Sequence, residues 1–219
     1  MHGMSEEEIE LRGTDSPRRS DARGAYSPPW TPDEREILLG AEEKMKEVPS
    51  LSNNVIKRLL PKGSYTATVQ ALAKKWGPVM DVDPLWIVAH CKVESSMQPL
   101  AHNESGNAYG LMQIKPATAV DIVRLIKAEG LSKDPRVSPV LKNWKSEPEN
   151  LFNPELNLML GAFYLGYLKK KFMTDDHKIV AAAYNQGPGA MRKALREKKL
   201  TAPMSHYVAS IEAAKREFA

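Results

Sequence analysis

Glu94 is the residue whose sequence surroundings most favour acid catalysis. Ile87, Cys91 and Glu94 are spaced i, i+4 and i+7 in a stretch without helix breakers, so they share one face of a predicted helix. A carboxyl at the end of an otherwise apolar stripe loses hydration, which raises its pKa. A carboxyl that stays protonated near neutral pH can donate a proton to a leaving group. The alternative is a helix-surface glutamate without a role, the common case for an arbitrary helix.

Four short blocks that follow one another along the chain favour the catalytic interpretation. They are Glu94-Ser95, GLMQI at 110–114, AAYNQGPG at 182–189 and HYV at 206–208. In this order they resemble the signature blocks of the soluble-lytic-transglycosylase-like (SLT) catalytic domain. The resemblance covers the chain from about Ser64 to its end and leaves the N-terminal third uncovered.

The resemblance implies a lysozyme-like fold and the activity of a peptidoglycan lytic transglycosylase. Such an enzyme cleaves the MurNAc-β-1,4-GlcNAc bond and closes a 1,6-anhydro ring on MurNAc. Glycosidases normally use two carboxylates, whereas the resemblance implies a single one, Glu94, which acts first as acid and then as base. The 2-acetamido carbonyl of the substrate would stabilise the anomeric cation in place of a second carboxylate.

The resemblance also assigns substrate-binding roles to several residues: Ser95, Met112, Gln113, Tyr184, Asn185 and Tyr207. Gln113 and Met112 would line the sugar subsites, and Tyr207 matches the family's late tyrosine, which typically bonds the catalytic acid. Simpler interpretations stay open: a local backbone bond for Ser95, core packing for Met112 and a helix C-cap for Asn185.

Two other functions remain open at this point. A goose-type-lysozyme-like muramidase would admit water and would favour a second carboxylate near the anomeric carbon, for which Glu104 in the turn-rich loop is the obvious candidate. A non-catalytic wall-binding subunit of a phage tail or secretion apparatus would need neither Glu94 nor the motif blocks. The intact blocks favour the transglycosylase.

The composition limits the partners of this chain. Of the 219 residues, 42% are hydrophobic, which suffices for one domain with a full core. The net charge of +4 fits an anionic polymer, but no dense basic run with interleaved aromatics indicates nucleic acid. The single cysteine, Cys91, excludes an internal disulfide and a multi-cysteine metal site. The resemblance implies peptidoglycan strands as the partner, and we expect a monomer with no nucleic acid, metal or cofactor.

The sequence contains neither a transmembrane segment nor a visible export signal. No stretch approaches the roughly 18 uninterrupted apolar residues of a membrane span, and the acidic N-terminus lacks the apolar region of a secretory signal. A cell-wall enzyme must nevertheless reach the wall. We expect the bacterial cell envelope (periplasm), with an export signal outside this sequence, or a phage particle as the carrier.

The elements that would position the site are almost all helices. Capping signals and periodicity predict helices over 31–47, 52–60, 64–76, 84–97, 116–129, 153–171, 176–185, 190–198 and 203–218. Prolines recur in an excursion at 131–150, and residues 103–114 favour an irregular or β-hairpin segment. The expected fold class is all-α with at most a small β-hairpin. Its parts would be a disordered or linker N-terminus (1–30), a helical extension (31–63) and a catalytic domain (64–219), which the resemblance makes lysozyme-like.

Overall fold

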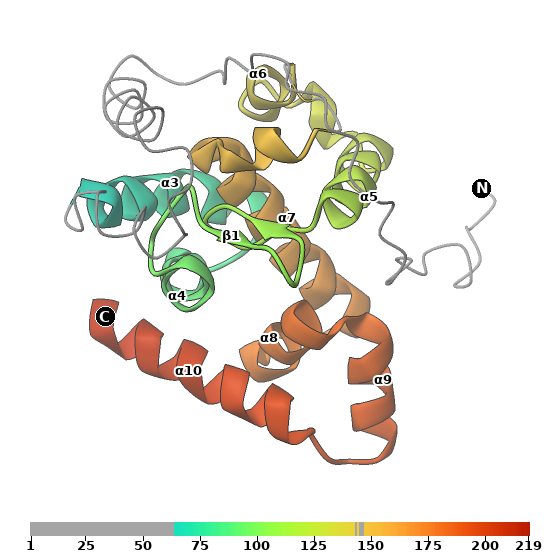
Figure 1. Cartoon of the computed structure of the whole chain (residues 1–219). Coiled ribbons are helices and arrows are strands. Elements are labelled where there is room, and N and C mark those ends of the chain that lie inside the picture. Colours follow the sequence, from blue (N-terminus) through green and yellow to red (C-terminus); the bar gives the residue numbers. More distant parts are fainter. Residues whose placement is uncertain (1–63, 143, 145–146) are drawn as a thin grey trace, which may run out of the picture.

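Helices make up most of the structure, a computed structural model that describes residues 64–142, 144 and 147–219 (Figure 1). The α-helices are α3 (Ser64–Met80), α4 (Pro84–Ser95), α5 (Pro116–Ala128), α6 (Val137–Leu141), α7 (Pro154–Phe172), α8 (His177–Gln186), α9 (Pro188–Arg196) and α10 (Ala202–Phe218). Two 3-10 helices, η2 (Leu131–Lys133) and η3 (Pro148–Phe152), lie between them, and strands β1 (His102–Asn103) and β2 (Ala108–Tyr109) form an antiparallel hairpin. The expected all-α fold with at most a small β-hairpin is confirmed. The predicted linker at 1–30 and the helices at 31–47 and 52–60 lie outside the described residues.

Helix α7 runs through the middle of the molecule (Figure 1). Asn153 caps it by accepting a hydrogen bond from the backbone N–H of Leu156 at 2.9 Å, and Pro154 occupies the first turn, as predicted. The sequence predicted one wide apolar face. Most residues from Pro154 to Leu168 are instead buried on every side of the helix, because α3, α4, α5 and α8 all pack against it.

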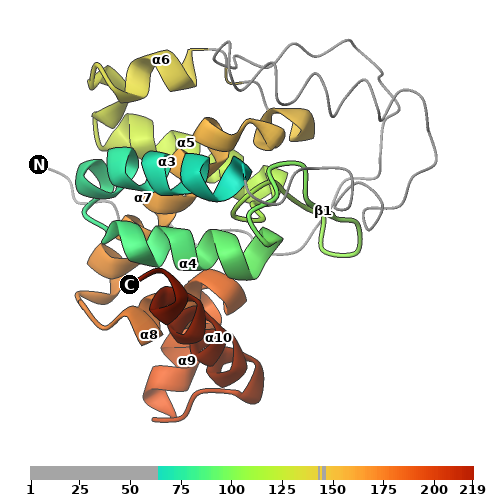
Figure 2. The same cartoon turned by 90° about the vertical axis from the view of Figure 1, so that its left-hand side faces the viewer.

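Helix α4 carries the predicted acid and lies between α3 and α10 (Figure 2). Asp83 Oδ1 accepts a hydrogen bond from the backbone N–H of Leu85 at 2.9 Å, so the predicted cap is present. The helix ends two residues before the predicted Met97. Ser96 adopts a left-handed conformation with φ 53°, which turns the chain out of the helix toward the hairpin.

Helix α3 is longer than the sequence predicted. The prediction ended it at Trp76, but it continues through Gly77 and Pro78 to Met80. Tertiary packing outweighs the local preference, because Met80 is buried in the core. Gly77 is also needed there, since a Cβ at this position would lie 2.6 Å from the carbonyl oxygen of Val82.

The described residues of the excursion at 131–150 include short helical segments at the top of the molecule in Figure 1. It includes η2, α6 and the start of η3, and Val137 is fully buried, so the segment is anchored to the core. Within the described part of the chain, no helix combines the length and the apolar character needed to cross a membrane.

Candidate active site

Glu94 lies in the last turn of α4 with its side chain partly buried. The hydroxyl of Tyr207 donates a hydrogen bond to Glu94 Oε1 at 2.5 Å. Burial raises the pKa of Glu94 from 4.5 to about 7, and the bond from Tyr207 acts in the opposite direction because it stabilises the ionised form. A carboxyl in this environment can hold a proton near neutral pH and release it.

Tyr207 reaches Glu94 from α10, which packs along α4 (Figure 2). Its side chain is buried, and Met204, Val208 and Ile211 anchor the same face of α10 in the core. The position of the hydroxyl therefore depends on the docking of the whole helix rather than on a flexible loop.

Tyr184 connects α8 to the loop that follows the hairpin. Its hydroxyl donates to the carbonyl oxygen of Met112 at 2.8 Å. Burial raises its pKa well above the ordinary value, and the nearby carboxyl of Glu94 adds to this effect, so Tyr184 is a neutral neighbour of the acid. The adjacent Asn185 is exposed, and its Oδ1 accepts a hydrogen bond from Gln186 Nε2 at 2.6 Å.

Asn157 of α7 holds the hairpin loop in place, although the sequence analysis did not single it out. Its Oδ1 accepts from the backbone N–H of Met112, and its Nδ2 donates to the carbonyl oxygens of Tyr109 and Leu151, all at 2.8 Å. Gly110 passes close by with φ 76°, and a Cβ there would lie 2.2 Å from the Leu151 carbonyl oxygen. An asparagine among the apolar residues of the core helix was the available signal.

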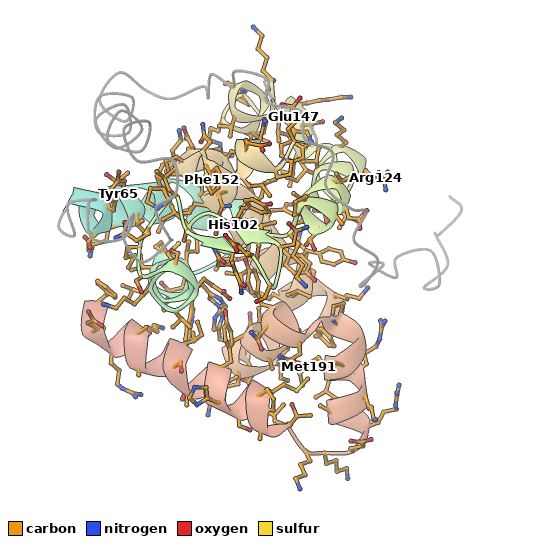
Figure 3. The ribbon with its side chains drawn as sticks, in the orientation of Figure 1. Tyr65, His102, Arg124, Glu147, Phe152 and Met191 are labelled. Carbon is orange, nitrogen blue, oxygen red and sulfur yellow. The ribbon has the colours of Figure 1, made fainter. Side chains whose placement is uncertain are left out.

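Aromatic rings form a second contact between the hairpin and η3. The ring of Tyr109 stacks on His102 with centroids 4.2 Å apart and meets the Phe152 ring edge-on at 5.5 Å. Figure 3 labels His102 and Phe152 beside the hairpin. The end of η3 is thereby fixed against β2.

Met112 and Gln113, two of the predicted substrate-binding residues, make their contacts within the protein. Met112 is fully buried, and its sulfur would lie 2.2 Å from a Cβ added at Gly161. Gln113 Nε2 donates to the carbonyl oxygens of Ala101 (3.1 Å) and Gly110 (2.9 Å). The placement of Met112 matches core packing, the simpler of the two interpretations, and substrate contact by either residue stays a prediction.

Ser95 is also buried, and its hydroxyl is hydrogen-bonded to backbone groups. Its hydroxyl donates to the carbonyl oxygen of Cys91 at 2.9 Å and accepts from the backbone N–H of Gln98 at 3.2 Å. These bonds shape the end of α4 beside the acid, so the local backbone role that the sequence left open is the one the structure contains.

His90 is a residue near the acid that the sequence analysis did not select. It is fully buried, and its Nδ1 and Nε2 lie 3.0 Å from Tyr207 Oη and 3.1 Å from His177 Nε2, respectively. The four-residue spacing between His90 and Glu94 on one helix was the signal that could have found it. Glu104, by contrast, is exposed in the turn between β1 and β2.

In the described ranges, no group of three or more His, Cys, Asp or Glu side chains is arranged to hold a metal ion. Cys91 is fully buried, and burial raises the pKa of its thiol, so it is not set up as a nucleophile. The chemistry that the arrangement offers is proton donation and acceptance by Glu94.

Comparisons with known proteins agree with one another. The family described as "Transglycosylase SLT domain" matches residues 71–205. The soluble lytic murein transglycosylase of Escherichia coli (strain K12) is 31% identical over 121 residues, which cover 55% of this chain and 16% of that protein. The membrane-bound lytic murein transglycosylase E of Buchnera aphidicola is 26% identical over 170 residues, 72% of this chain and 67% of that protein.

The same fold occurs in a solved structure. The crystal structure of the 70 kDa soluble lytic transglycosylase from Escherichia coli superposes with a TM-score of 0.57 and 22% sequence identity. The match covers 84% of this chain and 34% of that one, so the chain corresponds to about a third of that protein.

Proposed function

The chain belongs to the transglycosylase SLT domain family, and on that premise we propose that it is a lytic murein transglycosylase that cleaves the glycan strands of peptidoglycan. The observation that carries the proposal is the partly buried Glu94, whose pKa is raised to about 7 while one oxygen is bonded by Tyr207. An acid poised near neutral pH is suited to donate and then recover a proton at the same centre.

The proposed reaction uses Glu94 twice. Neutral Glu94 donates its proton to the glycosidic oxygen between MurNAc and GlcNAc, and the bond from that oxygen to C1 of MurNAc breaks. The 2-acetamido carbonyl of the same sugar stabilises the electron-poor C1. Ionised Glu94 then removes the proton from the C6 hydroxyl, whose oxygen attacks C1 and closes the 1,6-anhydro ring. No water is consumed, and Glu94 ends in its starting state.

The surrounding residues support this cycle in different ways. Tyr207 stabilises the ionised form of Glu94 between the two proton transfers through the bond to Oε1. We propose that Gln113, Tyr184 and Asn185 contact the glycan from the loop and the end of α8. Ser95 and Met112 would act through the backbone positions that they fix, since their side chains are buried.

The place of action follows from the substrate. We propose that the protein acts in the bacterial cell envelope and that residues 64–219 form its catalytic unit. The helices described above support this boundary because α3 packs against both α4 and α7 and so belongs to the same core as the acid.

The experiment that tests the function is mass analysis of purified peptidoglycan digested by wild type and by Glu94→Gln. We expect anhydro-muropeptides from the wild type and none from the variant. Glu104→Gln is the matched control, because it removes an exposed carboxyl in the hairpin turn and should leave the products unchanged. Reducing-end products that carry one added water, abolished by Glu104→Gln, would instead identify a muramidase. Binding without products from the wild type would identify a wall-binding subunit.

A further inference from the structure

Two histidines, one fully buried and one partly buried, lie behind the acid and have no part in the reaction proposed above. His90 is 0% exposed and precedes Glu94 by about one turn of α4, so the two side chains leave the same face of the helix. His177 begins α8 and stacks on Trp86 of α4, with ring centroids 3.7 Å apart and planes 16° from parallel. Both imidazole rings are thus fixed in orientation by their neighbours.

One series of hydrogen bonds joins these histidines to the acid, in the order His177, His90, Tyr207 and Glu94. The two histidine Nε2 atoms are 3.1 Å apart. His90 Nδ1 lies 3.0 Å from Tyr207 Oη, which lies 2.5 Å from Glu94 Oε1. Helices α8, α4 and α10 each contribute to this series, which is set by the packing of the fold.

Each imidazole of the series is neutral near neutral pH, so it carries one N–H and one acceptor nitrogen. Burial and the neighbouring His177 keep the pKa of His90 well below its usual range. Burial and the nearby Lys215 lower the pKa of His177 to about 3, against the opposing effect of Asp83. Lys215 itself is paired with Asp83 at 3.1 Å, which fixes the charges at this end of the series.

Each bond of the series contains one hydrogen, so the donors and acceptors can be arranged in two ways, here called the two directions of the series. In the first, every hydrogen points toward Glu94, with His90 protonated on Nδ1 and His177 on Nε2. In the second, every hydrogen points away, and Glu94 must carry its proton on Oε1 and donate it to Tyr207. An ionised carboxylate can only accept hydrogen bonds, so it is compatible with the first direction alone. When Glu94 is neutral, the first direction leaves its proton on Oε2, the oxygen that Tyr207 does not engage.

We propose that His90, fixed as the Nδ1–H tautomer by His177, is a positioning residue that makes the Tyr207 hydroxyl donate to Glu94 Oε1. The proton for transfer is thereby kept on Oε2, where a substrate can receive it. The proposal rests on the role given to Glu94 above and extends it to two histidines that lie outside all of the motif blocks.

The other titratable groups that face Glu94 do not compete with this arrangement. Cys91 on the same helix and Tyr184 of α8 stay neutral, because burial and the carboxyl of Glu94 raise the pKa of both. Tyr164 of α7 lies behind Tyr184, with ring centroids 5.6 Å apart, and is also neutral because burial raises its pKa. The Tyr207 hydroxyl is therefore the group that supplies a hydrogen to the carboxylate from this side.

The first test reads the tautomers directly in the full-length wild-type protein. Long-range proton–nitrogen NMR correlations distinguish Nδ1–H from Nε2–H imidazoles. At about pH 8.5, where Glu94 is ionised, we expect His90 to carry its hydrogen on Nδ1 and His177 on Nε2. The opposite tautomers, or an imidazolium at either position, would refute the proposal whether or not the protein is active.

The second test compares two variants of His90. His90→Asn retains an N–H donor near the position of Nδ1, whereas His90→Leu has similar bulk and no donor. Glu94 is followed by the carbon-13 signal of its carboxyl during a pH titration. We expect His90→Leu to raise the midpoint by up to about one pH unit, since the Tyr207 hydroxyl is no longer held in the direction that donates to the ionised form. His90→Asn should titrate close to the wild type.

The pH profile of turnover should shift in His90→Leu and stay close to the wild type in His90→Asn, as the carboxyl titration does. The basic limb of kcat/KM reports ionisation of the acid in the free enzyme, so it should move upward in His90→Leu and return in His90→Asn. If folded His90→Leu titrates as the wild type does, or if His90→Asn shifts as far as His90→Leu, then His90 serves only in packing. If His90→Leu does not fold, the NMR measurement of the His90 and His177 tautomers in the wild type decides whether the proposal holds. Absence of muropeptide products from the wild type would refute the proposed function, whereas the NMR results would still decide the role of His90.

Discussion

Glu94→Gln is expected to stabilise the protein at alkaline pH, because the fold disfavours the charge that this residue carries there. The rise of the Glu94 pKa from 4.5 to about 7 corresponds to about 3 kcal/mol, at about 1.4 kcal/mol for each tenfold change in acid dissociation. Desolvation is the larger cause of that rise, so the cost belongs to burying an ionised carboxyl in the folded state.

The sign of the effect follows from proton linkage. The folded chain binds this proton more tightly than the unfolded chain, so its contribution to stability is present in acid and is lost as the pH rises from about 4.5 to about 7. A glutamine keeps an oxygen that can accept from Tyr207 and never ionises. The variant should therefore exceed the wild type by about 3 kcal/mol at about pH 8.5 and by less than about 1 kcal/mol at about pH 5.

The assay is urea unfolding of both proteins at the two pH values, with the difference between them taken at each pH. This difference cancels the titration of groups that the two proteins share. Glu104→Gln is the control, because water solvates its exposed carboxyl before and after unfolding. A gain for Glu94→Gln that is equal at both pH values, or absent at the higher one, would refute the argument that burial raises the pKa of Glu94.

Three further predictions concern residues around the acid. Tyr207→Phe removes the donor to Glu94 Oε1 and should raise the pKa of Glu94 by about one unit, as measured by NMR titration of the carboxyl. Asn157→Leu removes the hydrogen bonds to the Met112 N–H and the Tyr109 carbonyl of the hairpin region and to the Leu151 carbonyl of η3, and should cost about 3 kcal/mol in urea unfolding, with faster amide exchange in the loop. Gly161→Ala should lower stability by about 1–3 kcal/mol because its Cβ would overlap the sulfur of Met112, and combining it with Met112→Ala should restore part of that loss.

The sequence was sufficient to place most helices of the described chain because their ends carry local signals. Asp83 and Asn153 both cap helices that begin with proline, and both starts were predicted correctly. Local signals failed where distant packing decides, as at Gly77, where α3 continues because Met80 is buried in the core. The burial of α7 on nearly every side was missed for the same reason, since a single sequence does not reveal how many neighbours a helix has.

The site was only partly predictable from residue types and spacing. Glu94 could be selected because its helical stripe is visible within one element, and the link to Tyr207 came from a resemblance rather than from spacing. The contact between His90 and His177 joins residues 87 positions apart, so no local sequence pattern predicts it. Ser95 was assigned to substrate binding by the resemblance, and that role stays a prediction, whereas its bond to the Cys91 carbonyl is the local backbone contact that the sequence also allowed.

The bond between Tyr207 and Glu94 spans 113 positions of sequence, which has a consequence for the newly made protein. At the usual rates of synthesis, the tyrosine is added on the order of 10 s after the glutamate. During that interval α4 can form, but its carboxyl lacks the hydroxyl that fixes one of its oxygens. In the nascent chain the carboxyl of Glu94 is therefore organised only after α10 has been synthesised and has docked on α4.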